Sequence, residues 1–225
     1  MKITKEGIAV LDDDKDSLLS RWVERDGRLD HDESLPHHYL RHIKAGDVVV
    51  DGGAAIGDHT IAYIRACGDA KLVHAFEPNP LMVECLSHNC PECHIHPYAL
   101  SDSDGAAWLA HDDSNAGAAF SNVDGNGVPI ETRTLDSFEF PKVDFIKLDL
   151  EGFEGRAILG ATATLRRCKP RMVLEMSPWM LRRAGSSFDG LLSHLKSIGY
   201  DWNVEMGEMP ALDGLDRAEF FFFPR

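Results

Sequence analysis

Short β-rich runs alternate with helical segments from residue 46 to the end of the chain, and this alternation limits the possible folds more than any other feature. Strands are predicted at 48–50, 72–77, 93–99, 144–150, 171–176, 200–204 and 219–223, and helices at 58–67, 80–89, 154–167 and 188–198. Strands that are separated by helices form a parallel sheet with both faces covered. The sequence therefore predicts an α/β protein with a doubly wound, mostly parallel sheet.

The same pattern divides the chain into two parts. Residues 1–45 mix charged and scattered apolar residues and are predicted to form a helical lead-in, whereas residues 46–225 are predicted to form one domain. Residues 101–140 interrupt the alternation, because they are rich in Gly, Asp, Ser and Asn, and short antiparallel strands are predicted at 107–110 and 128–134. Segments of this length often form lids or binding-site walls, so this irregular or β-rich insertion is expected near the active site.

The charge balance argues against two classes of partner. The 225 residues include 23 basic and 37 acidic side chains, which gives a formal net charge of −14 at pH 7. Proteins that bind nucleic acid usually carry clustered Lys and Arg that displace the counterions of the phosphates. The apolar runs at 48–50 and 220–223 are too short to span a membrane, and residues 1–16 lack the apolar core of a signal peptide. We expect a soluble, cytoplasmic protein without nucleic-acid or membrane partners.

The five cysteines are few and odd in number, which favours a reducing compartment over a disulfide framework. One pair, Cys90 and Cys93, has the spacing C-x-x-C and is flanked by His88, His94 and His96. Two thiolates and two imidazoles are ligands of structural zinc sites, but no second C-x-x-C pair follows. Free thiols between a helix and a strand are the interpretation that we prefer.

The first informative motif is a glycine-rich turn, DGGAAIG at residues 51–57, between the first predicted strand and its helix. A dinucleotide fingerprint G-x-G-x-x-G would need glycine at position 54, where this chain has alanine. The pattern that fits is acidic-x-Gly-x-small-x-Gly. It leaves the helix N-terminus for a carboxylate and the acidic side chain for an amino group, which are the groups at the methionine end of S-adenosylmethionine. Tight packing of strand on helix is the structural alternative.

Acidic residues also end the second and third predicted strands. Glu77 follows Gly57 by 20 residues (77 − 57), and an acidic side chain at that distance from the glycine turn binds ribose hydroxyls. Glu77 would otherwise act as a helix cap, but Asn79 already provides a capping side chain before Pro80. Asp102 either accepts a hydrogen bond from an adenine amino group or belongs to a plain turn. The predicted cofactor-binding residues are Asp51, Gly53, Ala54, Gly57, Glu77, Pro78, Asn79, Ser101 and Asp102.

A further carboxylate, Asp149, ends the strand predicted at 144–150, which is apolar enough to be a buried central strand. Burial of a carboxylate is costly unless it is paired or acts on a ligand, so Asp149 is predicted to be functional. Glu151 either shares that role or stabilises the N-terminus of the next helix through its dipole. His111, in the irregular segment, either overlies the site or is an exposed loop histidine.

Three blocks of the sequence resemble the FkbM family of S-adenosylmethionine-dependent methyltransferases. They are VVVDGGAAIGDHT, VHAFEPNP and FIKLDLEGFEGRAILGATATLRRCKPRMVLEM, and the resemblance extends from about residue 46 to residue 177. Gly52 departs from the family pattern D-x-G-A, in which this position often carries a bulkier residue. The resemblance implies a Rossmann-like class I methyltransferase fold over residues 46–225, with a mostly parallel seven-stranded sheet whose last strand is antiparallel.

The resemblance also implies a reaction, the transfer of a methyl group from S-adenosylmethionine to a hydroxyl of a sugar, glycan or small natural product. The protein mainly has to align the acceptor oxygen with the methyl carbon, and a general base helps to remove the hydroxyl proton. Asp149 is the first candidate for that base or for orienting the acceptor, followed by Glu151 and His111. Asp149 and Glu175, on neighbouring strand ends, either bind Mg²⁺ or pair with Lys147 or nearby arginines.

Two other functions are compatible with such a sheet. An NAD(P)-dependent Rossmann oxidoreductase is disfavoured by Ala54 and by the lack of an evident Tyr-x-x-x-Lys pair. A non-catalytic module that only binds the cofactor is disfavoured by the acidic strand ends. The sequence does not identify the acceptor, and Trp179, Met180 and Leu181 are predicted to belong to the core rather than to a substrate wall or a dimer patch.

Overall fold

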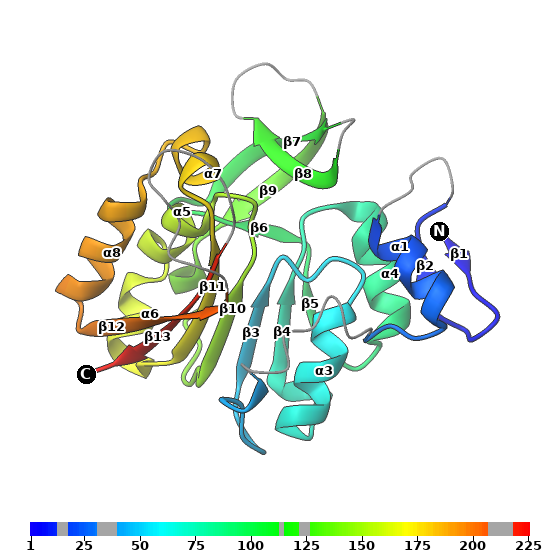
Figure 1. The fold of residues 1–225 in the computed structure, drawn as a ribbon, viewed down its shortest axis with the longest axis horizontal. Helices are drawn as coiled ribbons and strands as arrows, with labels where there is room; N and C mark the ends of the chain where they lie inside the picture. Colours follow the sequence, from blue (N-terminus) through cyan, green and yellow to red (C-terminus); the bar gives the residue numbers. More distant parts are fainter. Residues whose placement is uncertain (13–17, 31–39, 113–114, 122–126, 207–217) are drawn as a thin grey trace.

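A seven-stranded sheet forms the centre of the molecule (Figure 1), whose computed structural model describes residues 1–12, 18–30, 40–112, 115–121, 127–206 and 218–225. In spatial order the strands are β12 (Tyr200–Met206), β13 (Ala218–Pro224), β11 (Arg171–Met176), β10 (Phe145–Leu148), β3 (Val49–Gly52), β4 (Val73–Phe76) and β5 (His94–His96). The five strands from β11 to β5 are parallel, and β13, the last in the chain, is antiparallel to both of its neighbours. The predicted sheet is confirmed, including its antiparallel last strand.

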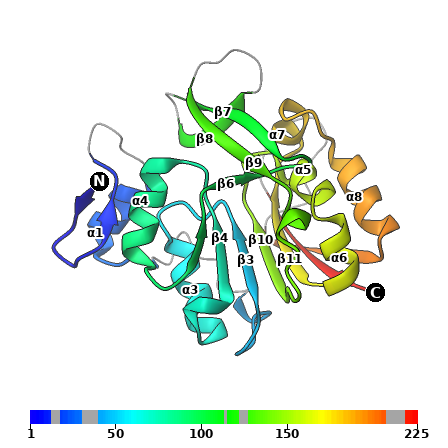
Figure 2. The same cartoon turned by 180° about the vertical axis from the view of Figure 1, so that it is seen from behind.

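Helices cover both faces of this sheet (Figures 1 and 2). The helices are α1 (Leu18–Asp26), α3 (Asp58–Cys67), α4 (Pro80–Asn89), α5 (Glu154–Leu159), α6 (Thr162–Cys168), α7 (Pro178–Arg183) and α8 (Phe188–Ser197). Helix α3 packs on one face, whereas α5, α6 and α8 pack on the other. None of the helices in the described ranges is both long and apolar enough to cross a membrane.

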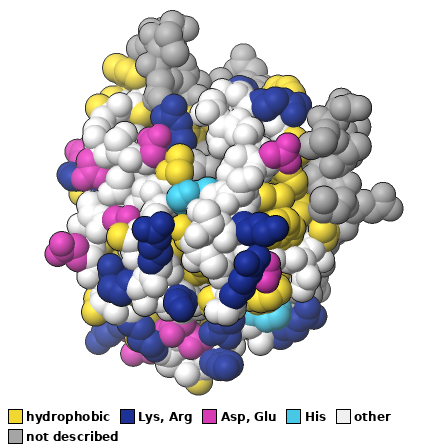
Figure 3. Space-filling model, turned by 90° about the vertical axis from the view of Figure 1, so that its left-hand side faces the viewer, with side chains coloured by type: hydrophobic (Ala, Val, Ile, Leu, Met, Phe, Trp, Pro, Cys, Tyr) yellow, Lys and Arg dark blue, Asp and Glu magenta, His cyan; other side chains and the backbone are white. Residues whose placement is uncertain are grey.

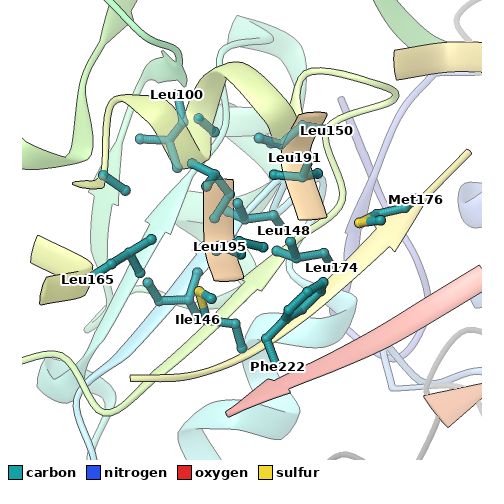
Figure 4. Close-up of a cluster of buried hydrophobic side chains, with 14 of the residues drawn as sticks. Leu100, Ile146, Leu148, Leu150, Leu165, Leu174, Met176, Leu191, Leu195 and Phe222 are labelled. Atoms are coloured by element: carbon teal, nitrogen blue, oxygen red, sulfur yellow. The ribbon is translucent and has the colours of Figure 1, made fainter. Parts of the chain in front are cut away.

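Side chains of the central strands alternate between these two faces, as expected for a buried strand. In β10, Phe145 packs in the cluster with Tyr63 of α3, whereas Ile146 and Leu148 belong to the larger cluster on the opposite face. Figure 4 shows this larger cluster, in which Leu195 of α8 lies over the strands. The larger part of the core therefore lies between the sheet and α5, α6 and α8, and a smaller part lies between the sheet and α3.

The two helices next to the glycine turn begin and end where the sequence predicts. Helix α3 ends at Gly68, whose φ of +86° is a left-handed conformation that suits glycine at a helix C-terminus. Helix α4 is capped by Asn79, whose side chain accepts a hydrogen bond from the Leu81 N–H (3.0 Å), and Pro80 occupies its first turn. Local chemistry therefore marks the end of α3 and the start of α4, which follows the carboxyl end of β4.

A second sheet of four strands lies over the carboxyl ends of the central strands (Figure 1). Its order is β6 (Tyr98–Leu100), β9 (Val128–Arg133), β7 (Gly105–Asp112) and β8 (Asn115–Ser121). Strand β7 contains the strand predicted at 107–110, and β9 covers all but the last residue of the strand predicted at 128–134. The two strands pair antiparallel with each other. Most of this sheet thus comes from the segment that interrupts the alternation of strands and helices.

Two predicted elements are divided in the structure, and the first 45 residues contain more than helix. The strand predicted at 93–99 is two strands, because Pro97 lies between β5 in the central sheet and β6 in the second sheet. The helix predicted at 154–167 is interrupted at Gly160, where a Cβ would lie 2.0 Å from the Ser101 carbonyl oxygen. At the N-terminus, β1 (Lys2–Ile3) and β2 (Ala9–Val10) form an antiparallel pair.

Candidate active site at the carboxyl ends of the strands

The glycine turn after β3 lies against the ends of two other strands. The N–H groups of Gly53 and Ala54 donate to the carbonyl oxygen of Phe76 in β4 (3.0 and 3.1 Å). Gly53 has a φ of +82°, and a Cβ added to it would lie 2.0 Å from the carbonyl oxygen of Asp149. Glycine is therefore needed here for the backbone conformation and for the close approach of the turn after β10. The ends of β3, β4 and β10 meet at this point.

Asp51 is buried within β3 beside the start of α3. Its Oδ2 accepts a 2.6 Å hydrogen bond from the Thr60 hydroxyl. Burial raises the pKa of Asp51 to about 6, although the hydrogen bond from Thr60 and the charge of Lys147 oppose this rise. Burial thus favours the neutral form of Asp51, whereas Thr60 and Lys147 favour the ionised form.

Glu77, at the end of β4, holds the glycine turn and the start of α4 together. Its Oε2 accepts the N–H of Ala55 (2.9 Å), and its Oε1 accepts the N–H of Asn79 (2.8 Å). Burial raises the pKa of Glu77 to about 7, the two backbone N–H groups lower it, and Asp51 adds to the rise. A carboxylate oxygen accepts more than one hydrogen bond, so each oxygen retains capacity for a ligand hydroxyl.

A cavity of about 160 Å³ opens between these strand ends and the second sheet. Its lining residues are Gly53, Ala55, Phe76, Glu77, Pro78, Met82, Tyr98, Ala99, Leu100, Leu109, Asp149, Leu150 and Glu151. Polar groups of the three central strand ends form one side, and apolar side chains of β6 and β7 form another. The cavity therefore combines carboxylates with an apolar wall, as small-molecule sites commonly do.

The cavity brings together some of the predicted cofactor-binding residues and not others. Gly53, Glu77 and Pro78 line it. The remaining residues lie around it or farther away: Asp51, Ala54, Gly57 and Asn79 support the turn and the helix starts, and Ser101 and Asp102 follow β6. The cofactor-binding set as a whole stays a prediction.

Ser101 and Asp102 have surroundings of their own. Ser101 lines a neighbouring cavity of about 140 Å³, which shares Ala99 and Leu100 with the first. The Asp102 carboxylate lies 3.7 Å from the Arg156 guanidinium and accepts a hydrogen bond from the Ser101 hydroxyl (3.2 Å). A contact between Asp102 and an adenine would therefore compete with this ion pair.

The turn after β10 presents two carboxylates to the cavity, Asp149 and Glu151. Asp149 Oδ2 lies 3.6 Å from the Nζ of Lys147, which is buried in β10. Glu151 has a φ of +52°, a conformation that is uncommon for residues other than glycine. Both residues lie where catalytic groups would face a bound ligand, and their catalytic roles stay predictions.

The structure gives no support to a magnesium site at Asp149 and Glu175. Both residues line a narrow space together with Glu151 and Glu154. In the described ranges, however, no group of three or more His, Cys, Asp or Glu residues is arranged to hold a metal ion. Asp149 instead faces Lys147, which is the pairing that the sequence left open as the alternative.

Three further expectations concern single side chains. His111 belongs to β7, but its side chain lies outside the described part of the structure. The Cys90 and Cys93 thiols are free, and burial raises the pKa of each to about 12, which favours the thiol form over the thiolate that zinc needs. Trp179, which is expected in the core, is 53% exposed, because the buried residues of α7 are Pro178 and Leu181.

Sequence reasoning missed two features of the site. Glu154 hydrogen-bonds the turn after β10, and Tyr98 and Leu109 supply part of the apolar wall. These contacts depend on how distant segments fold together, and no local pattern reports them.

Comparison with known proteins agrees with this architecture. A family model for the methyltransferase FkbM domain matches residues 51–202. AglP, a hexuronic acid methyltransferase of Haloferax volcanii, is 29% identical over 158 residues, which cover 67% of this chain and 64% of that protein. The chain thus spans less than two thirds of the length of this curated relative.

Two solved structures share the fold. Methyltransferase FkbM from Methylobacillus flagellatus superimposes with a TM-score of 0.54 at 19% identity, over 78% of this chain and 43% of that one. A Streptococcus mutans protein solved in complex with SAH superimposes with a TM-score of 0.52 at 7% identity, over 84% of this chain and 94% of that one. At these identities the likeness shows the fold alone. Because the family model covers more than half of the sequence, the chain belongs to the FkbM methyltransferase family.

Proposed function

We propose that the protein is an S-adenosylmethionine-dependent methyltransferase that methylates a hydroxyl oxygen of a sugar, a glycan or another small hydroxylated molecule. One observation carries the proposal: Glu77 and Asp149 line the same cavity, on either side of the glycine turn at Gly53. A carboxylate suited to ribose and a carboxylate suited to an acceptor hydroxyl therefore face one space. Membership of a methyltransferase family supports the reaction type.

The residues around the cavity fit this cofactor. Glu77 keeps hydrogen-bond capacity on both oxygens for ribose hydroxyls, and Met82, Tyr98 and Leu109 provide apolar surface for an adenine ring. The bound cofactor supplies a methyl group on a positively charged sulfur. When they are ionised, Asp51 and Glu77 add negative charge beside the glycine turn, which favours a cationic ligand. The Streptococcus mutans structure with the same fold contains SAH, which agrees with this assignment.

Asp149 is the residue that we assign to the acceptor. Its carboxylate would accept the proton of the acceptor hydroxyl while the oxygen is held in line with the methyl carbon. Glu151 adds a second carboxylate to the same part of the wall. Two carboxylates disfavour an anionic acceptor group there and favour a neutral hydroxyl. The relative AglP is named for hexuronic acid, and such sugars offer hydroxyls of this kind.

The domain assignment and the partners belong to the same proposal. We assign residues 46–225 to the methyltransferase domain and residues 1–45 to an addition. Its strand β2 packs beside α4, where Asn89 hydrogen-bonds both the N–H and the carbonyl oxygen of Ala9. All five cysteines are free, which fits the cytoplasm. In Figure 3 the basic side chains gather mainly in the lower half of the face shown, whereas the carboxyl ends of the strands lie toward the top in Figure 1. The formal net charge of −14 also disfavours nucleic acid, so we propose a small-molecule or glycan acceptor.

The first test is calorimetric binding of S-adenosylhomocysteine to wild type and to Glu77→Gln. We expect wild type to bind and the variant to bind about 10- to 100-fold more weakly, because hydrogen bonds to a charged group each contribute about 1.5–3 kcal/mol. Glu92→Gln, an exposed residue beyond α4, is the matched control and should bind as wild type does. A folded wild-type protein that binds NAD and not S-adenosylhomocysteine would refute the proposal.

The second test is turnover with S-adenosylmethionine and the methyl glycosides of glucose, galactose and glucuronic acid, measured as formation of S-adenosylhomocysteine. Asp149→Asn should keep cofactor binding and lose turnover by about 100-fold or more, which lies in the range for a general base. A variant that keeps its turnover would remove Asp149 from the mechanism. Binding of the cofactor without turnover on any hydroxylated acceptor would favour a non-catalytic binding module.

A further inference from the structure

Glu154, the first residue of α5, turns its side chain back over the turn that precedes it. Its Oε1 accepts the N–H groups of Leu150 (2.7 Å) and Gly152 (3.3 Å). The residue is 1% exposed, and its Oε2 is enclosed without a hydrogen-bond partner in the described part of the chain. The side chain thus serves the turn that carries Asp149 and Glu151 to the cavity, and it does not line that cavity itself.

The turn needs such support because its backbone has an uncommon shape. Glu151 and Gly152 are two consecutive residues with positive φ, +52° and +106°. A Cβ at Gly152 would lie 2.5 Å from the Met180 carbonyl oxygen, so α7 leaves the turn no room on that side. Backbone conformations of this kind persist only where the surroundings hold them. Glu154 supplies two of the bonds that do so.

The charged groups around Glu154 are mostly acidic. Asp149, Glu151 and Glu175 line the same narrow space, and the Lys147 Nζ lies 3.6 Å from the carboxylate of Asp149. From the side of α7, Ser177 and Met180 add no charge. Burial, with a contribution from Asp149, raises the pKa of Glu154 to about 7, and the N–H groups of the turn oppose the rise. Glu154 therefore changes its charge near neutral pH.

We propose that Glu154 is a positioning residue for methyl transfer, which holds the Leu150–Gly152 turn in the shape that directs Asp149 and Glu151 into the cavity. The proposal rests on the proposed function, because it assigns the turn to the acceptor side of that site. Glu154 acts through the turn and not on the reacting atoms. An ionised carboxylate accepts N–H hydrogen bonds more strongly than a neutral carboxyl, so the turn is held most firmly when Glu154 has lost its proton.

The first experiment needs neither cofactor nor acceptor. The amide resonances of Leu150 and Gly152 are followed by NMR in the free protein between pH 5.5 and pH 8.5. We expect both amides to titrate together with a midpoint near pH 7 in wild type and in the control Glu92→Gln, and to lose this transition in Glu154→Gln. Amides that do not titrate in wild type, or that titrate unchanged in Glu154→Gln, would overturn the proposal.

The second experiment measures kcat, at saturating S-adenosylmethionine, with whichever methyl glycoside of the panel is turned over. Glu154→Ala should lower kcat by about 100-fold, which is the typical effect of misplacing a reacting group by about 1 Å, with binding of S-adenosylhomocysteine changed less than about 3-fold. Glu154→Gln keeps an oxygen for the two N–H groups, so it should recover most of the kcat and lose the rise of kcat around pH 7.

The outcomes separate this proposal from the function on which it rests. If wild type does not bind S-adenosylhomocysteine, the proposed function fails, while the amide titration still decides whether Glu154 holds the turn. If wild type binds and turns over, but Glu154→Ala keeps the wild-type kcat, the positioning role fails alone. If Glu154→Ala does not fold, Glu154→Gln decides through its pH profile, and an unchanged profile would contradict the proposal.

Discussion

Asp51 and Glu77 are two buried carboxyl groups, and burial favours their neutral forms in the free protein. Burial raises the pKa of Asp51 to about 6 and that of Glu77 to about 7. A cationic ligand with ribose hydroxyls binds the ionised forms better, so protons on these groups must be released when the ligand binds below those pKa values. The affinity for the cofactor is therefore linked to pH.

We predict that the affinity for S-adenosylmethionine falls as the pH falls from 8 to 5.5, by up to about tenfold per pH unit for each proton released. Calorimetry at several pH values, in two buffers with different ionisation enthalpies, measures both the affinity and the number of protons. Glu77→Gln should show a shallower dependence than wild type. An affinity that is independent of pH over this range would contradict the assignment of the two carboxylates to the cofactor.

Single residues of the candidate site differ in whether the sequence alone predicts them. The sequence predicts Glu77 from its position 20 residues after Gly57 and Asp149 from its place at the end of an apolar strand, and both residues line the cavity. Glu154 was not found, because a glutamate at the start of a helix has an ordinary explanation in the helix dipole. Its contacts with Leu150 and Gly152 depend on the backward course of the chain, which no local pattern reports.

At the scale of the elements, the contact between the turns after β3 and β10 depends on Gly53. Its φ of +82° nearly equals the +86° of Gly68, but a Cβ at Gly53 would lie 2.0 Å from the Asp149 carbonyl oxygen, whereas nothing lies within 4 Å of a Cβ at Gly68. The two glycines therefore form a matched pair. Both share the conformational cost of a side chain at positive φ, and only one has the steric clash.

We predict that Gly68→Ala lowers the free energy of unfolding by about 1 kcal/mol, the cost of alanine at positive φ, and that Gly53→Ala lowers it by roughly 3 kcal/mol or more, since the backbone of the second turn must also move. Urea denaturation of both variants measures the difference. Equal effects of the two substitutions would show that the turns do not pack as closely as the structure has them.

The bounds of an element can be predicted where capping residues or prolines mark its ends. They cannot be predicted where contacts with distant segments determine where the element stops. Asn79, Pro80 and Gly68 mark the ends of α3 and α4, and both helices have the predicted bounds. By contrast, Gly160 interrupts the predicted helix because the backbone after β6 approaches it. Tertiary contacts also divide the strand predicted at 93–99. The residues before Pro97 pair within the central sheet as β5, and the residues after it pair within the second sheet as β6.

At the scale of the whole molecule, folding raises the pKa of at least three carboxyl groups in and beside the site. The pKa is raised to about 6 for Asp51 and to about 7 for Glu77 and Glu154, and burial is the main cause in each case. Between the unfolded-state pKa values and these raised values, the folded protein binds more protons than the unfolded chain. Their contribution to stability is thus full at low pH and is lost as the pH rises through about 7.

Glu77→Gln isolates one of these contributions, because glutamine does not titrate and all other groups are common to both proteins. We predict that the variant gains stability relative to wild type as the pH rises from 5 to 8, by roughly 3 kcal/mol for a pKa raised from 4.5 to about 7. Chemical denaturation of both proteins at each pH measures this difference. A constant difference across pH would mean that Glu77 is ionised in the folded protein throughout. The expected result would instead show that the fold gives up stability near neutral pH to keep a carboxylate where a ligand binds, as functional sites often do.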